Sequence, residues 1–120
     1  MLVKNLADCK EITAGDECTL RELINANTAD VSFGYSLAHA WVKPKSKTIA
    51  HKLKTSELYY ILSGAGIMHI NDETKNVKQY DCIYIPPNAT QYIENTENED
   101  LIFMCIVDPA WCRENEQILK

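Results

Sequence analysis

Hydrophobic and polar residues alternate over short stretches through the middle of the chain, which is the pattern of half-buried β-strands. Residues that favour turns separate these stretches, among them Gly64, Gly66, Asn71 and Asp72. The stretches expected to form strands are 33–42, 48–53, 58–62, 67–70, 82–85, 90–94 and 101–107. Short strands at regular spacing with turn signals between them predict an all-β sandwich or barrel.

The two ends of the chain are less regular than the middle. Residues 16–24 fit either a strand or a single helical turn. Residues 101–107 are apolar without interruption, which predicts a strand covered on both faces. Pro109 precedes a stretch that suits at most a short C-terminal helix. We expect one domain over residues 1–120, with an N-terminal arm or edge segment at 1–30, a barrel at 35–108 and a tail at 109–120.

Composition narrows the function classes. The chain has 120 residues, a formal charge of −5 and no cluster of lysine and arginine, so we expect no nucleic-acid partner. No segment reaches the roughly 18 apolar residues of a membrane helix, and the first residues lack the apolar run of a signal peptide. We therefore expect a cytoplasmic protein without a membrane partner. The five cysteines match no zinc pattern, which indicates free thiols.

A first motif lies between residues 45 and 64 and contains His51, Glu57 and Gly64. It resembles the first signature of the cupin superfamily, usually written G(x)5HxH(x)3–4E(x)6G. Lys45 stands where that signature opens on glycine, and Leu53 stands where it has its second histidine. One imidazole and the glutamate are therefore in place.

A second motif lies between residues 80 and 95 and resembles the second cupin signature, G(x)5PxG(x)2H(x)3N. Pro86 and Asn95 occupy their expected places. Tyr80 and Asn88 stand in place of the two glycines, and Gln91 stands in place of the late histidine. Two motifs in the expected order are far more specific than one.

The resemblance implies an antiparallel jelly-roll β-barrel with a divalent metal inside it. By position, the ligands would be His51, Glu57 and Gln91, and His39 on the preceding strand is a candidate replacement for the imidazole lost at Leu53. Manganese, iron, nickel and zinc all suit such a mixed set of nitrogen and oxygen donors. The loss of one histidine predicts weaker metal binding than at a complete site.

The chain also resembles the small stand-alone cupins that are grouped with mannose-6-phosphate isomerases. Such cupins generally pair, so we expect a homodimer. The segment before residue 31 would add edge strands or cover the partner, because open sheet edges are a liability.

Strand alternation extends the candidate site. Residues two apart in a strand point the same way, so an inward His51 brings Leu53 with it and an inward Glu57 brings Tyr59. We expect Leu53, Tyr59 and Gln91 to line a ligand pocket. A buried Glu57 needs a neutralising partner, either a cation or a protonated His51. His69 is expected at the rim or on the surface.

Three functions remain open at this point. The first is a metal-dependent enzyme, for example an isomerase, acting on a small carbonyl compound or sugar derivative. The second is a module that binds a small polar ligand without turning it over. The third is metal-free acid–base catalysis by His51 with Tyr59, as in cupin sugar epimerases. Glu57 and Tyr59 are the candidate catalytic residues, and the sequence leaves open whether the protein is an enzyme.

Overall fold

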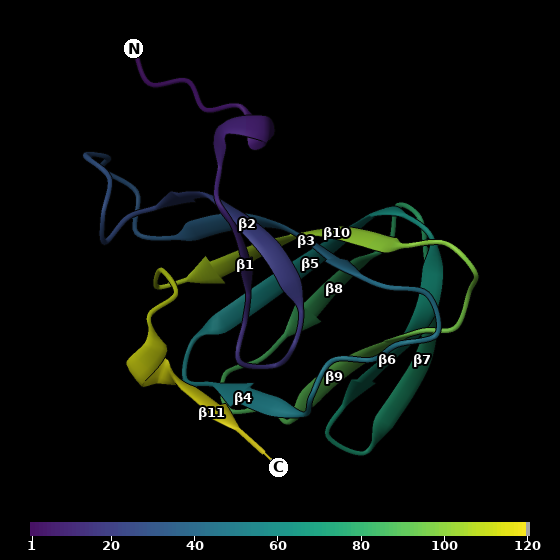
Figure 1. The fold of residues 1–120 in the computed structure, drawn as a ribbon. Helices are drawn as coiled ribbons and strands as arrows, with labels where there is room; N and C mark the ends of the chain where they lie inside the picture. The colour runs from purple at the N-terminus through teal and green to yellow at the C-terminus, as the bar shows by residue number, and fades with distance from the viewer. Residues whose placement is uncertain (120) are drawn as a thin grey trace.

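The computed structural model describes residues 1–119, and it consists of two antiparallel sheets that face each other around a common core (Figure 1). The six-stranded sheet has the order β1 (Glu11–Thr13), β2 (Thr19–Asn25), β3 (Ser36–Val42), β10 (Leu101–Asp108), β5 (Ser56–Ser63) and β8 (Cys82–Ile85). The five-stranded sheet has the order β11 (Glu116–Ile118), β4 (His51–Leu53), β9 (Gln91–Asn95), β6 (Ala65–Ile70) and β7 (Glu73–Lys78). The predicted all-β jelly-roll barrel is confirmed.

Alternation along the strands decides which side chains enter the barrel. In β5, Glu57, Tyr59 and Ile61 are buried, whereas Leu58 and Tyr60 are exposed. The apolar strand β10 also alternates, with its odd-numbered residues buried and its even-numbered residues only half-buried through most of its length. The outer face of β10 is thus only partly covered. The prediction that residues 101–107 are covered on both faces is wrong for this outer face.

The hydrophobic core fills the space between the two sheets. Phe103 of β10 and Tyr59 of β5 pack with ring centroids 4.5 Å apart, and Ile61, Ile85 and Ile93 are fully buried around them. Each such side chain contributes about 1.5–3 kcal/mol through removal from water. The barrel interior is therefore a packed core with polar residues set into it, rather than an open channel.

Three segments differ from the sequence-based expectation or settle an open alternative. Residues 19–25 form strand β2 and extend the chain's own sheet. Strand β7 was not expected because its residues are almost all polar, but it pairs with β6 along its whole length. Within residues 109–119, the tail forms the 3-10 turn η2 (Arg113–Asn115), followed by β11, which pairs with β4. A second 3-10 turn, η1 (Leu6–Asp8), lies near the N-terminus.

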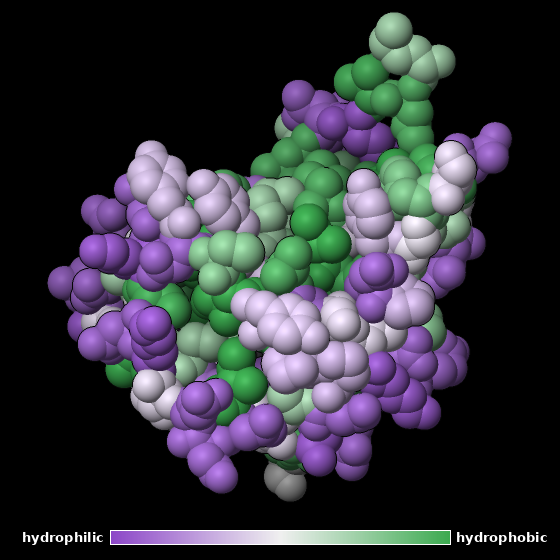
Figure 2. Space-filling model, turned by 180° about the vertical axis from the view of Figure 1, so that it is seen from behind, coloured by the Kyte–Doolittle hydropathy of each residue, from purple (hydrophilic) through white to green (hydrophobic). Residues whose placement is uncertain are grey.

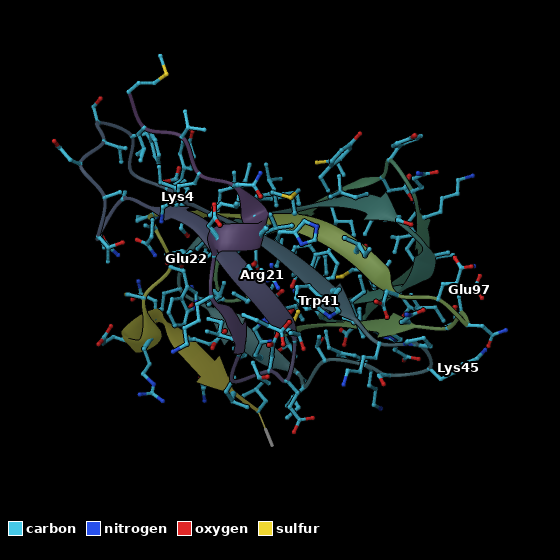
Figure 3. The ribbon with its side chains drawn as sticks, turned by 45° about the horizontal axis from the view of Figure 1, so that its top comes forward. Lys4, Arg21, Glu22, Trp41, Lys45 and Glu97 are labelled. Carbon is cyan, nitrogen blue, oxygen red and sulfur yellow. The ribbon has the colours of Figure 1, made fainter. Side chains whose placement is uncertain are left out.

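Three turns keep an unusual backbone at the places where the two motifs would have glycine. Lys45, Tyr80 and Asn88 have φ angles of 60°, 75° and 66°. Non-glycine residues are uncommon in this left-handed region, and each costs about 1–2 kcal/mol there. The Lys45 side chain donates a hydrogen bond of 2.6 Å to the carbonyl of Thr96, and Figure 3 shows Lys45 at the same end of the barrel as Glu97.

No helix within residues 1–119 combines the length and the apolar character needed to cross a membrane.

Candidate functional site

A group of polar side chains is buried inside the barrel between β4, β5 and β9. His51, Glu57 and Gln91 have relative exposures of 2%, 6% and 1%. His51 and Gln91 are direct strand partners in β4 and β9. Leu53 and Tyr59, which share their strands' inner faces with His51 and Glu57, are buried as well.

The His51 ring is fixed by its backbone environment. Its Nδ1 atom lies 2.9 Å from the carbonyl oxygen of Ile49, which can only accept, so Nδ1 carries the proton and donates. The other ring nitrogen, Nε2, faces the Asp16 carboxylate, with 3.7 Å between Nε2 and Oδ2. His51 therefore presents Nε2 to the interior of the site.

Asp16 is a member of this site that sequence reasoning did not identify. It lies in the turn between β1 and β2, where Ile49 N–H donates to its carbonyl at 2.7 Å and Cys18 N–H donates to its Oδ1 at 3.0 Å. Burial raises the pKa of the Asp16 carboxyl, and the nearby His51 opposes this shift. No signal in the sequence connects this turn with the cupin-like motifs.

Glu57 and Asp16 are the two buried acids of the site, with relative exposures of 6% and 5%. Burial raises the pKa of Glu57 from 4.5 to about 8, hydrogen bonding to Gln91 lowers it, and the charges of Asp16 and Glu116 raise it further. The Glu57 Oε1 atom has no hydrogen-bond partner among residues 1–119. At neutral pH, Glu57 is thus mainly a neutral carboxylic acid that has a hydrogen bond left to make.

Tyr59 and Gln91 form a hydrogen-bonded pair beside Glu57. The Tyr59 hydroxyl donates to Gln91 Oε1 over 3.3 Å. Burial raises the pKa of Tyr59 well above its usual value, and the Glu57 charge adds to this. Tyr59 therefore acts here as a hydrogen-bond donor and is poorly suited to act as a base.

The C-terminal tail adds a second carboxyl that the sequence did not indicate. Glu116 of β11 is the strand partner of Leu53 in β4. Burial raises the pKa of the half-buried Glu116 carboxyl, while His51 lowers it. Asp16 and Glu116, from a turn near the N-terminus and from the last strand, therefore both bring a carboxyl towards the His51 imidazole.

This donor set does not make a complete metal centre. Within residues 1–119, no group of three or more histidine, cysteine, aspartate or glutamate side chains is arranged so that it could hold a metal ion. Leu53, which is 3% exposed, fills the position where the motif has its second histidine. The four-ligand set of the motif is therefore incomplete here, and His51, Glu57 and Gln91 occupy its other three positions.

The two other histidines lie away from the buried group. His39 is the strand partner of Arg21 and Met104 on the outer face of β3, where its ring lies 6.1 Å from that of Trp41. Figure 3 shows Arg21 and Trp41 on this face. The structure therefore does not bring His39, the candidate replacement ligand, to His51. His69 is partly exposed and pairs with Glu94 at 2.9 Å, outside the barrel core.

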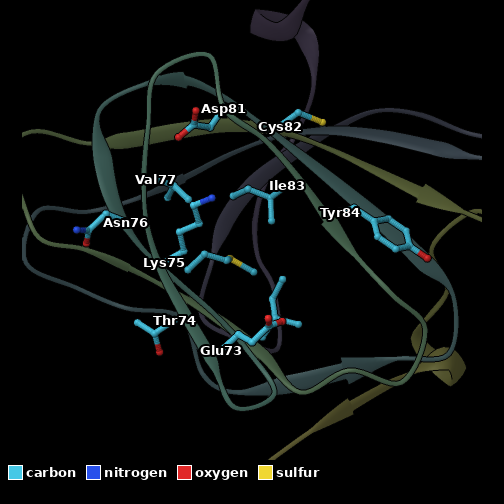
Figure 4. Close-up of a pocket in the computed structure, with 11 residues that line it drawn as sticks. Glu73, Thr74, Lys75, Asn76, Val77, Asp81, Cys82, Ile83 and Tyr84 are labelled. Atoms are coloured by element: carbon cyan, nitrogen blue, oxygen red, sulfur yellow. The ribbon is translucent and has the colours of Figure 1, made fainter.

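A cavity of about 410 Å³ opens between β7 and β8, which are the edge strands of the two sheets (Figure 4). Its apolar wall comes from Met68, Ile70, Val77 and Ile83. The expected pocket residues Leu53, Tyr59 and Gln91 do not line it.

The cavity nevertheless adjoins the buried group. Ile83 is the strand partner of Tyr59, and Ile70 is the strand partner of Gln91. Partners on neighbouring strands have Cβ atoms about 5 Å apart. The Tyr59–Gln91 pair therefore lies beside the wall of this cavity.

Sequence comparison with known proteins identifies similar chains and a matching family. A family model described as "Cupin domain" matches residues 39–107. The chain is 42% identical over 106 residues to an uncharacterized protein of Methanocaldococcus jannaschii, covering 88% of this chain and 84% of that protein. It is also 35% identical over 65 residues to the oxalate-binding protein of Thermotoga maritima, covering 53% of this chain and 54% of that protein.

Solved structures agree on the architecture. A predicted oxalate decarboxylase of Thermotoga maritima superposes with a TM-score of 0.76 at 24% identity, over 88% of this chain and 97% of that one. An oxalate decarboxylase of Bacillus subtilis with Mn(II) centres gives a TM-score of 0.80 at 23% identity, over 95% of this chain and 31% of that one. At this level of identity the likeness shows the fold alone.

Proposed function

Because the chain belongs to the cupin family, we propose that it binds a small polar molecule in its barrel, without a complete metal centre. The observation that carries this proposal is the Glu57 carboxyl, which is buried, mainly protonated at neutral pH and left with an unpartnered Oε1. A buried polar group without a partner costs about 1–3 kcal/mol. A ligand that hydrogen-bonds to this group would recover that free energy.

The chemistry of the site favours an oxygen-rich ligand. The Glu57 acid can donate a proton to a carbonyl or hydroxyl oxygen, and the Gln91 amide and Tyr59 hydroxyl lie next to it. The Thermotoga maritima relative is an oxalate-binding protein, and oxalate is a small oxygen-rich molecule. Sugar derivatives and small carbonyl compounds, the classes expected from these polar side chains, match such a site.

A second candidate function is acid–base catalysis. A pKa of about 8 places the Glu57 carboxyl close to neutral pH, where a general acid or base is most effective. Tyr59 takes the role of a positioning donor in this proposal, because its hydroxyl is engaged with Gln91. Isomerisation of a carbonyl compound would need such a group beside the bound ligand.

Thermal melts of the wild type and Glu57→Gln test these functions together. We expect small sugars, hydroxy acids or carbonyl compounds to raise the Tm of the wild type through linkage, and to raise it less in the variant. We expect manganese, iron, nickel and zinc ions to leave both proteins unchanged. A cation that stabilises only the wild type would establish the metal-dependent alternative.

The catalytic function is tested by incubating a stabilising carbonyl compound with the protein in D2O, where proton transfer exchanges a ligand proton for deuterium. If Glu57→Gln retains this exchange, Glu57 is excluded as the catalytic group.

We also propose that the protein forms a homodimer through the outer face of its larger sheet. Leu58 and Tyr60 of β5 and Tyr84 of β8 are exposed there, and Met104 and Ile106 of β10 lie beside them. Figure 2 shows hydrophobic residues gathered across one side of the molecule. A chain with a charge of −5 repels its copies, so an uncharged face is the surface suited to a self-complementary twofold contact.

Light scattering at micromolar concentration checks this assembly. We expect the mass of a dimer for the wild type and a shift toward the monomer for Tyr60→Lys, because the new charge would be buried in the interface. Tyr80→Lys is the matched control, since Tyr80 is exposed but lies in the turn between β7 and β8. A monomeric wild type, or equal effects of the two substitutions, would contradict the proposed interface.

A further inference from the structure

A lysine lies on the inner face at the mouth of the cavity between β7 and β8. Lys75 of β7 is the strand partner of the buried Met68, and it shares its face with the buried Val77 two residues along. In Figure 4 its side chain extends into the space between Val77 and Ile83. Lys75 itself is exposed, so its ammonium group can meet a ligand that enters the cavity from solvent, while its stem lies beside the apolar wall.

The charges around Lys75 leave its ammonium group available. It forms no ion pair with the other described residues. Two carboxylates, Glu73 and Asp81, also line the cavity. Asp81 Oδ2 already accepts a hydrogen bond of 2.9 Å from the Lys78 backbone N–H. The cavity thus offers one free cation, an apolar wall and two acidic groups.

We propose that this cavity binds a small monocarboxylate with an apolar portion, and that Lys75 Nζ pairs with the ligand's carboxylate. This inference rests on the proposed small-molecule binding and names its ligand class. The apolar portion would pack against Met68, Ile70 and Ile83. Glu73 and Asp81 would repel a second negative charge, so a monocarboxylate fits better than a dicarboxylate.

Edge protection is the competing explanation for Lys75. β7 and β8 are edge strands, and inward-pointing charges on edge strands discourage pairing with other chains. Under that explanation the lysine affects self-association and has no effect on ligand binding. The two roles therefore predict different results for the same substitution.

The test is an NMR titration of the full chain with hexanoate, with its neutral analogue hexanamide and with the dicarboxylate adipate. We expect hexanoate to bind with shifts at the cavity residues, and more tightly than either comparison compound. Lys75→Met keeps the apolar stem and should weaken hexanoate binding by up to about fivefold, the upper end of the range for an exposed ion pair. Added salt should weaken binding to the wild type and have little effect on the variant.

Lys78→Met is the matched control, because Lys78 is on the same strand but does not line this cavity. Equal hexanoate binding by the wild type and Lys75→Met would overturn the role of Lys75, and self-association of that variant would then identify edge protection. If sugars or neutral carbonyl compounds bind but hexanoate does not, the ligand class is wrong and small-molecule binding stands. If no compound of either set binds, both proposals fail.

Discussion

Glu57→Gln should be more stable than the wild type at pH 8, by several kcal/mol, and nearly equal to it below pH 4.5. Burial raises the pKa of Glu57 from 4.5 to about 8 in the folded protein. Between these values the unfolded chain releases its proton while the folded chain keeps it, so wild-type stability falls as pH rises. At 1.36 kcal/mol for each pKa unit, this difference between the folded and unfolded pKa of Glu57 corresponds to roughly 4–5 kcal/mol of stability.

The variant removes this dependence because glutamine is neutral at every pH and has nearly the same shape. Urea unfolding at a series of pH values measures the difference. Asp16 and Glu116 also have raised pKa values, so the comparison with the wild type at each pH, rather than either curve alone, isolates Glu57. Glu97→Gln, at an exposed glutamate in the loop after β9, should follow the wild-type curve. Parallel curves for Glu57→Gln and the wild type would show that Glu57 is already ionised when buried.

Gly66→Ala should lower the free energy of unfolding by at least about 3 kcal/mol, more than most single substitutions. Gly66 of β6 pairs with Asn95 of β9, and a Cβ at this position would collide with the carbonyl oxygen of Glu94. That oxygen belongs to the backbone, so β6 and β9 would have to separate. Gln91 and the strand that places it in the site would move with them.

Gly34→Ala is the control for this substitution. The nearest atom to a Cβ there is Asp108 Oδ1 at 4.0 Å, which leaves room for a methyl group. We expect a change within about 1 kcal/mol, since replacing glycine without a clash also reduces the entropy of the unfolded chain. Denaturant melts of the two variants under identical conditions measure the contrast. A similar loss in both would show that backbone approach at Gly66 is not the cause.

Alternation of hydrophobic residues was enough to predict most of the barrel, because burial on one face of a strand leaves a period of two in the sequence. Glu57 and Tyr59 show how far this extends, since the motif placed Glu57 on the inner face and parity placed Tyr59 beside it. The polar strand β7 left no such pattern, because it forms the open edge of its sheet. Its pairing with β6 depends on the turn at Asn71, whose φ is 52°.

The surroundings of His51 could not be predicted for a different reason. Asp16 reaches it from a turn near the N-terminus and Glu116 from the last strand, so both contacts depend on tertiary pairing rather than local pattern. The parity of His39 could not be followed through Pro44 and Lys45, and the structure places it outside the barrel. Motif spacing marked the positions of the candidate site, while the side chains that replace the motif residues set the chemistry available there.

The left-handed turns at Lys45, Tyr80 and Asn88 have a consequence for how such proteins are recognised. Glycine is the residue that adopts this backbone without steric cost, which explains its place in the motif. A search that scores residue identity penalises this chain at all three turns, although its main chain has the required shape. A profile of backbone torsion angles would instead record three agreements, and it would extend recognition to chains whose letters have diverged further.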